Sequence, residues 1–201
     1  MTHPRDQIVE TARSIYSRGL THGSTGNLSV RSGDRIFITP TGSSLGTVQP
    51  DEIAEIDPDG TAITQCKPSK EAFIHAAILR IRPELGAVVH THSTYATAVS
   101  CLPGLHPDST LPPLTVYFEM RVGSLPLVPR FRPGDTTMTA TIEKLAATNA
   151  AMLLQNHGPV AAGTTLQSAL DTIEEIEHTA HIFLLTQAHS GRTTATIKDN
   201  R

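Results

Sequence analysis

The sequence predicts an α/β layered domain. Short apolar runs that are typical of strands alternate along the chain with longer segments of helical apolar spacing. The chain has 201 residues and no internal repeat or low-complexity linker, so residues 1–201 are expected to form a single domain with a sizeable core. Hydrophobic residues make up 38% of the chain and aromatic residues only 4%, which predicts a core of Ala, Val, Ile and Leu.

The first part of the chain predicts one helix and two strands. A helix is expected from residue 8 to Gly19, because apolar residues recur at helical spacing and glycine is a typical stop signal. A polar loop follows. Two short apolar runs beyond it predict strands at 28–30 and 35–39.

The middle of the chain predicts two helices around a buried strand. Ser69 is a natural N-cap for a helix that Pro83 closes. The apolar run after that helix predicts a strand at 86–91, followed by a short helix from about 94 to 101. Four prolines between residues 102 and 113 predict an irregular loop.

The last part of the chain returns to the alternation of strands and helices. Its apolar runs and helical stripes predict strands near 114–118, 125–128, 151–155 and 160–162, and helices near 136–147 and 166–189. The pattern does not determine whether neighbouring strands run parallel or antiparallel.

Charge and apolar run length exclude two classes of partner. The net charge is −3 and the cationic residues form no basic stripe, so no nucleic acid is expected. No apolar run approaches the roughly 20 residues that span a bilayer, so no membrane is expected. The first residues lead into an amphipathic pattern without the apolar core of a signal peptide, and Cys66 and Cys101 are isolated. Both observations predict a cytoplasmic protein with reduced thiols.

Three histidines and one glutamate predict a metal site. His90 and His92 follow the apolar run 87–89, and side chains at i and i+2 on a strand face the same way, so both imidazoles can reach one ion. His157 stands at the end of another apolar run, and Glu71 adds a carboxylate. Three neutral imidazoles and a carboxylate predict a divalent transition metal, with zinc first and manganese or cobalt as alternatives.

Glu71 has two interpretations. It occupies the first turn of its predicted helix, where the helix dipole favours an anionic side chain, so a capping or solvated glutamate is one of them. Beside a metal it would serve as ligand, as proton acceptor, or as each in turn.

Three other histidines lie on predicted helices. His75 lies one helical turn beyond Glu71, where packing is the simpler interpretation and support of Glu71 the alternative. His178 and His181, beside acidic residues of the last helix, are interpreted as an exposed charged face.

A group of small polar residues predicts an oxyanion site. Its segments are Gly26-Asn27, Thr41-Gly42-Ser43 and Ser69-Lys70. Backbone N–H groups in glycine-containing turns, hydroxyls and a helix N-terminus all favour phosphate, and Lys70 adds a positive charge. Ordinary turn and cap chemistry is the alternative for each segment taken singly. No Walker motif or dinucleotide fingerprint is present, so the phosphate is expected to belong to a small substrate.

Five short motifs together resemble the class II aldolase/adducin family. They occur in order between about residues 8 and 185 as Gly26-Asn27-Leu28-Ser29, Thr39-Pro40-Thr41-Gly42, Ser69-Lys70-Glu71, His90-Thr91-His92 and Asn156-His157-Gly158. The resemblance implies a three-layer α/β/α domain with a central sheet. It also implies a homo-oligomer, usually a tetramer, whose sites lie near the subunit interfaces.

The motif matches imply a role for each residue. His90, His92 and His157 would hold one zinc ion per subunit, and Glu71 would be both a carboxylate of that site and the proton acceptor. Tyr117 falls where the aldolases place a tyrosine proton donor. The phosphate-binding positions of the family fall on Asn27, Thr41, Gly42, Ser69 and Lys70.

Two features resemble the branch of the family that decarboxylates 3-oxo-tetronate 4-phosphates. One is Lys70, where sugar-phosphate aldolases carry a second serine, and the other is the stretch from Tyr117 to Asp135. The resemblance implies a zinc-dependent carbon–carbon lyase that forms dihydroxyacetone phosphate and CO2 through a metal-stabilised enediolate. The alternatives are a ketose 1-phosphate aldolase of the fuculose-phosphate type and a non-catalytic, adducin-like interaction domain. Retention of all the motif histidines with Glu71 and Tyr117 argues against the last.

Three arginines in or near that stretch are candidate partners for a substrate carboxylate. Arginine recognises carboxylates with a two-pronged hydrogen bond, and the chain carries Arg121, Arg130 and Arg132. Surface charge or ion pairs at an interface are the alternative for all three.

Overall fold

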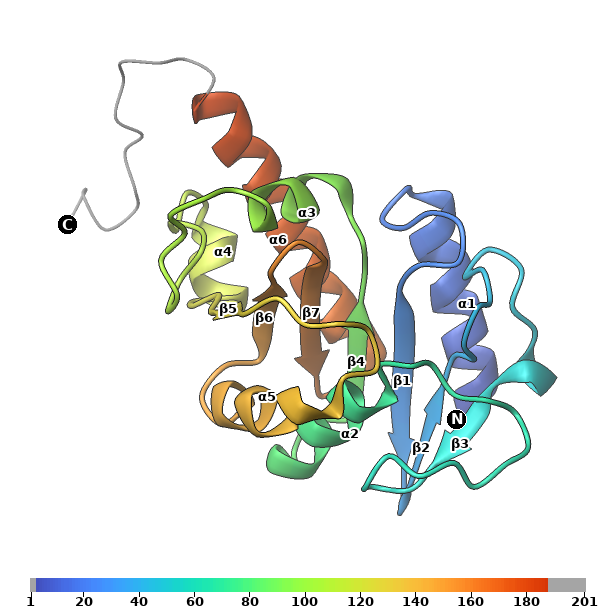
Figure 1. The fold of residues 1–201 in the computed structure, drawn as a ribbon. Helices are drawn as coiled ribbons and strands as arrows, with labels where there is room; N and C mark the ends of the chain where they lie inside the picture. The colour runs from blue at the N-terminus through green and yellow to red at the C-terminus, as the bar shows by residue number, and fades with distance from the viewer. Residues whose placement is uncertain (1–2, 188–201) are drawn as a thin grey trace.

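The computed structural model describes residues 3–187, which form a seven-stranded mixed sheet between two helical layers (Figure 1). The strand order is β3-β2-β1-β4-β7-β6-β5. Neighbouring strands are antiparallel except β5 and β6, which are parallel. The strands are β1 Asn27–Ser32, β2 Arg35–Ile38, β3 Ala54–Ile56, β4 Ala87–His90, β5 Leu127–Val128, β6 Ala151–Leu154 and β7 Gly158–Gly163.

Helices cover both faces of this sheet. On one face lie α1 Pro4–Ser17, α3 Thr94–Ser100 and α6 Leu166–Gln187, with α4 Val116–Arg121 packed against α6. The other face carries α2 Ala72–Ile81 and α5 Thr139–Ala146. Each face has its own apolar core, and strand alternation sends neighbouring residues into different cores: Val89 into the first and Val88 into the second. The predicted three-layer α/β/α architecture is confirmed (Figure 1).

Most predicted elements occur within a few residues of their expected bounds, but three differ. The segment predicted as a strand at 114–118 is helix α4, because the Thr115 side chain accepts a hydrogen bond from the Phe118 N–H at 2.9 Å and the Phe118 ring is fully buried. Strand β3 was not predicted. Helix α2 begins at Ala72, so its N-cap residue is Glu71 rather than Ser69. The predicted end of the last helix, 188–189, lies outside the described residues.

Two further features concern the environment of the chain. None of the helices within residues 3–187 combines the length and apolarity needed to cross a membrane. Cys66 and Cys101 are both free thiols, the first half-buried and the second exposed.

Candidate metal centre

Sheet pairing brings the three predicted histidines together. Strand β4 ends at His90, and His92 follows two residues later. The antiparallel register of β4 and β7 places Val160 opposite His90, which carries the preceding turn with His157 to the same end of the sheet. One ring nitrogen from each histidine lies within 4.8 Å of the others. The structure therefore forms a compact imidazole cluster from two segments more than sixty residues apart in sequence.

Backbone geometry around His157 requires two unusual residues. Asn156 adopts a left-handed conformation with φ +57°. Gly158 has φ +152°, and a Cβ there would stand 2.3 Å from the carbonyl oxygen of Thr91. The Asn-His-Gly sequence thus allows the turn after β6 to lie directly against the segment between His90 and His92.

The donor atoms fit a divalent cation. His90 Nδ1 lies 2.9 Å from the carbonyl oxygen of Pro159 and must donate to it, so the lone pair of His90 is on Nε2. That nitrogen is 3.1 Å from His92 Nε2 and 3.4 Å from Glu71 Oε2. Glu71 Oε1 is buried without a hydrogen-bond partner among residues 3–187 and lies 3.2 Å from His157 Nε2. Converging imidazole lone pairs and an unpartnered carboxylate oxygen are what a cation would satisfy.

The environment of Glu71, His92 and His157 favours the protonation states that metal binding needs. Burial opposes ionisation of Glu71, but electrostatic interaction with His90 and His157 and a hydrogen bond from Asn27 outweigh it, so the pKa of Glu71 is lowered. Burial, followed by repulsion from His90, lowers the pKa of His92 to about 3 and that of His157 to about 4. At neutral pH this gives an ionised carboxylate beside the neutral imidazoles of His92 and His157.

A buried hydrogen-bond chain orients Glu71 from behind. Asn27 donates from Nδ2 to Glu71 Oε2 at 2.9 Å, so its Oδ1 faces His75 Nε2 at 2.5 Å. Because Oδ1 only accepts, Nε2 carries the proton and Nδ1 accepts from the Ser29 hydroxyl at 2.7 Å. His75 is fully buried, and burial lowers its pKa to about 3. The interpretation of His75 as support for Glu71 therefore accounts for its contacts better than packing alone.

Acid should destabilise the metal-free protein through His75. Its pKa is about 3 in the folded protein and about 6.5 when unfolded. Between these values the unfolded chain binds one extra proton at this residue, so the contribution of His75 to stability is complete above about pH 6.5 and falls as pH decreases, by about 1.4 kcal/mol per pH unit. The lowered pKa values of His92 and His157 add to the slope in the same direction. Urea unfolding of chelator-treated protein between pH 7.5 and 5 measures this slope. His75→Gln should make the slope shallower and the exposed-site control His106→Asn should not; equal slopes in all three proteins would contradict the assignment.

The predicted phosphate residues line one cavity with the imidazole cluster. Asn27, Thr41, Gly42, Ser69 and Lys70 all contribute to a cavity of about 240 Å³ that also reaches Glu71, His92 and His157. The antiparallel register of β1 and β4 pairs Asn27 with His90, which places the first phosphate candidate beside the cluster. Gly26 permits this approach, since a Cβ there would meet the His90 carbonyl oxygen at 2.9 Å. We name this space the phosphate-side cavity.

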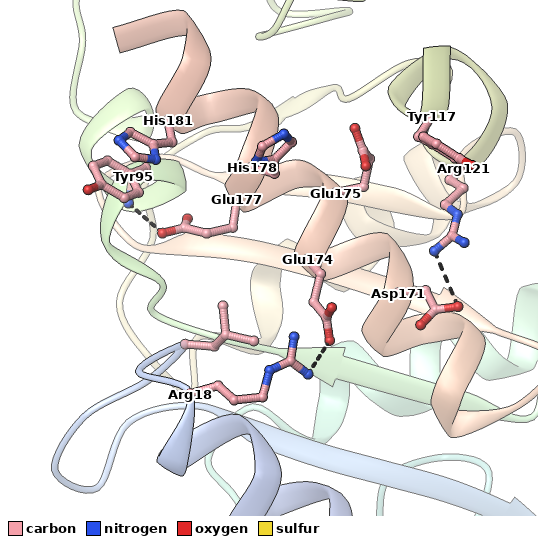
Figure 2. A pocket seen from close by; sticks show the side chains of 11 residues that line it. Arg18, Tyr95, Tyr117, Arg121, Asp171, Glu174, Glu175, Glu177, His178 and His181 are labelled. Carbon is pink, nitrogen blue, oxygen red and sulfur yellow. Dashed lines mark hydrogen bonds and ion pairs between the residues drawn. The ribbon is translucent and has the colours of Figure 1, made fainter. Parts of the chain in front are cut away.

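Tyr117 lies elsewhere in the chain. It is 59% exposed on α4 and lines a separate cavity along α6, together with Arg121, Asp171 and His178 (Figure 2). Tyr117 does not line the phosphate-side cavity. Within one copy of residues 3–187, the structure brings together every other predicted site residue but not this one.

Phe131 is a site neighbour that the sequence did not reveal. Its ring packs at 6.3 Å from the ring of Phe73 and 6.2 Å from that of His157, measured between centroids. The surrounding loop has no periodic pattern. Its one local signal is an aromatic residue between two arginines, which by itself does not indicate contact with a histidine nearly thirty positions away.

The fold and the cluster together define the class of protein. The Class II Aldolase and Adducin N-terminal domain matches residues 6–184 of this chain. The chain belongs to the class II aldolase/adducin family, and the resemblance inferred from its motifs is confirmed.

Individual relatives resemble the chain over nearly its full length. It is 43% identical over 198 residues to the 3-oxo-tetronate 4-phosphate decarboxylase of Haemophilus influenzae, covering 97% of this chain and 94% of the relative. The L-fuculose phosphate aldolase of Methanocaldococcus jannaschii is 33% identical over 181 residues, covering 90% and 96%. The crystal structure of YgbL from Klebsiella pneumoniae superposes with a TM-score of 0.91 at 39% identity, covering 98% of this chain and 95% of that one.

Proposed function

We propose that this chain is a metal-dependent lyase that decarboxylates a 3-oxo-tetronate 4-phosphate to dihydroxyacetone phosphate and CO2. The observation that carries the proposal is one cavity shared by the phosphate candidates and the imidazole cluster, which suits a small phosphorylated substrate with oxygens to place at a cation. The 43% identity to a decarboxylase of that name, against 33% to an aldolase, supports this branch.

Four side chains are proposed to hold the metal. They are His90, His92, His157 and Glu71, a nitrogen and oxygen donor set that suits zinc and also accepts manganese or cobalt. A divalent ion bound there would supply Lewis acidity, stabilising the negative charge that develops on the substrate as its carboxylate leaves. The presence of one such cluster among residues 3–187 supports a stoichiometry of one ion per subunit.

Glu71 is proposed to move the proton that the reaction needs. Loss of CO2 leaves negative charge at C2, and a proton must be added there to give dihydroxyacetone phosphate. The net reaction consumes one proton from solvent, which the ionised Glu71 carboxylate would take up and then deliver to C2 after CO2 has left. The hydrogen bond from Asn27 holds one carboxylate oxygen, which leaves Oε1 for this exchange.

The substrate phosphate is proposed to occupy the phosphate-side cavity. Lys70 would contribute charge, Ser69 and Thr41 hydroxyls, Gly42 a backbone N–H, and Asn27 its amide. The Asn27 amide contacts both His75 and Glu71, so the phosphate and the proton-transferring carboxylate would share one support.

Tyr117 is proposed as a proton donor to the site of a neighbouring subunit in a homo-oligomer. Because it lines a different cavity from the histidines in its own chain, it would have to reach the site of another copy. We propose a cytoplasmic homotetramer in which this occurs and in which all of residues 1–201 belong to one domain. The exposure of Tyr117, Val116 and Met120 on α4, between 59% and 74%, supports a role for this helix in subunit contact.

Two other functions use the same fold. A ketose 1-phosphate aldolase would need the same phosphate cavity and metal ligands, and it is the second candidate. An adducin-like interaction domain would need neither. Glu71 Oε1 is buried and has no hydrogen-bond partner among residues 3–187, which disfavours that third function, because a buried carboxylate oxygen without a cation would reduce stability.

The deciding experiment is CO2 release from both C2 epimers of 3-oxo-tetronate 4-phosphate by zinc-loaded protein. We expect one equivalent each of CO2 and dihydroxyacetone phosphate from at least one epimer. Dihydroxyacetone phosphate plus an aldehyde from a ketose 1-phosphate, without CO2 from either epimer, would establish the aldolase instead. Protein that takes up no metal and turns over neither substrate class would favour the interaction domain.

A further inference from the structure

A second cavity opens beside the imidazole cluster. It measures about 680 Å³ and shares His92, Pro133 and His157 with the phosphate-side cavity. Its remaining lining includes Arg130 and Arg132. A ligand centred on His92 and His157 can therefore extend in two directions, toward Lys70 on one side and toward Arg130 and Arg132 on the other. We name this second space the arginine-side cavity.

The loop that carries these arginines is fixed by specific contacts. The Arg130 N–H donates to Gln155 Oε1 at 3.2 Å, next to the turn that holds His157. The Phe131 ring packs against the ring of His157. At the far end the carbonyl oxygen of Arg132 accepts a hydrogen bond from the Asp135 N–H at 2.9 Å. These contacts hold the backbone that carries Arg130 and Arg132 in a fixed position beside the site.

The charges of Arg130 and Arg132 are available to a ligand. Within residues 3–187 neither side chain forms an ion pair with a carboxylate, although Asp135 also lines the cavity and interacts electrostatically with Arg132. The third arginine differs. Arg121 pairs with Asp171 at 3.2 Å in the cavity along α6 (Figure 2), and that cavity is not lined by His90, His92 or His157. The sequence made all three arginines candidate partners for a substrate carboxylate. In the structure only Arg130 and Arg132 line a cavity beside the imidazole cluster.

We propose that Arg130, with Arg132 beside it, binds the C1 carboxylate of the substrate and makes the site selective for sugar-acid phosphates over ketose phosphates. The inference rests on the proposed function and adds to it the group that recognises the acid. A substrate with phosphate at one end and carboxylate at the other would span both cavities, with its central oxygens at the histidines. A ketose phosphate offers no anion to the arginine side.

This role predicts a particular kinetic pattern. The carboxylate carries its charge in the bound substrate and loses it as CO2 forms, so an arginine contact stabilises the ground state at least as much as the transition state. Removing the contact should raise KM without a matching loss of kcat. A charged hydrogen bond on an exposed side chain corresponds to a change in affinity of about 10-fold.

Binding measurements on two inert ligands test the proposal. One ligand is tetronate 4-phosphate, which has the carboxylate but lacks the 3-keto group needed for decarboxylation, and the other is dihydroxyacetone phosphate, which lacks the carboxylate. Titration calorimetry on zinc-loaded Arg130→Gln, Arg132→Gln and the double variant should show the acid bound about 10-fold more weakly in the double variant. Dihydroxyacetone phosphate should change by less than about 2-fold. Arg13→Gln, an exposed arginine on α1, is the matched control.

The outcomes distinguish this inference from the proposed function. Equal weakening of both ligands, or no weakening of the acid, would overturn the carboxylate subsite even in an active decarboxylase. Selective weakening of the acid would support the subsite even if the wild-type protein released no CO2, a result that would overturn only the proposed reaction. In an active enzyme, a KM increase of about 10-fold with kcat within about 3-fold would give independent support.

Discussion

Replacing Glu71 by glutamine should lower CO2 release by about 10²–10⁴-fold, the usual contribution of a positioned proton-transfer group. Glutamine keeps the volume of the side chain and can still accept from Asn27, so the surrounding packing should survive. It cannot carry the negative charge that the neighbouring histidines favour, and it cannot accept and return a proton. The loss should therefore appear in kcat rather than in substrate binding.

The proton-transfer role of Glu71 can be measured without the acid substrate. Wild-type protein in D2O should exchange one hydroxymethyl proton of dihydroxyacetone phosphate, because exchange reverses the last step of the proposed reaction. Glu71→Gln should suppress that exchange, while Glu10→Gln, an exposed glutamate on α1, should match wild type. Metal analysis separates the two roles of the residue. Exchange at the wild-type rate by metal-replete Glu71→Gln would contradict proton transfer, and loss of metal would make Glu71 primarily a ligand.

Strand periodicity accounts for what the sequence predicted about the histidines. The expected alternation of side chains predicted that His90 and His92 would face the same way. In the structure β4 ends at His90, and the Nε2 atoms of the two rings lie 3.1 Å apart. The pattern alone did not specify the approach of His157, since that depends on the pairing of β4 with β7 and on a turn that only Gly158 permits. Sheet polarity was undetermined from the sequence, so this long-range register had to come from the structure.

The phosphate candidates illustrate the same limit. The turns and small polar groups were readable locally from Gly, Ser, Thr and Asn chemistry, although the N-cap of α2 is Glu71 and not Ser69, and their convergence required Asn27 to pair with His90 across β1 and β4. The series of hydrogen bonds that runs from Ser29 through His75 and Asn27 to Glu71 also depends on how β1 is placed. Ser29 and Asn27 must both face α2. The spacing of His75 one helical turn from Glu71 made support of Glu71 an alternative to packing, but it did not indicate that Asn27 would link the two side chains.

Strand propensity gave the wrong prediction for residues 114–118, where a local cap and tertiary packing both favour a helix. Val116, Tyr117 and Phe118 are all residues that favour strands, and the sequence predicted one. Thr115 instead caps a short helix and its hydroxyl donates to Glu175 on α6, which attaches α4 to that helix. Tyr117 is consequently displayed on the outer surface, and its proposed catalytic role depends on assembly rather than on the fold of one chain.

Replacing His92 by asparagine should abolish stoichiometric metal binding and reduce CO2 release to background. The cluster offers three imidazoles, and removal of one leaves an incomplete set of strong donors, so zinc affinity should fall on the order of 10²-fold or more. Replacing His92 tests metal binding more cleanly than replacing His90. The His90 ring is fully buried and hydrogen-bonded to Pro159, so its replacement would also disturb the sheet. His106→Asn, in the exposed loop before α4, is the matched control.

Zinc content after gel filtration and the response of the melting temperature to a chelator test this loss directly. A ligand that binds only the folded state stabilises it in proportion to the logarithm of its concentration over Kd. Chelation should therefore lower the melting temperature of wild type and of His106→Asn, and should leave His92→Asn unchanged. If His92→Asn retained one zinc per chain and its response to chelator, the imidazole cluster would not be the metal site. If it lost zinc yet kept full CO2 release, the metal would be structural, and the lyase chemistry would have to rest on Glu71 and the phosphate-side residues alone.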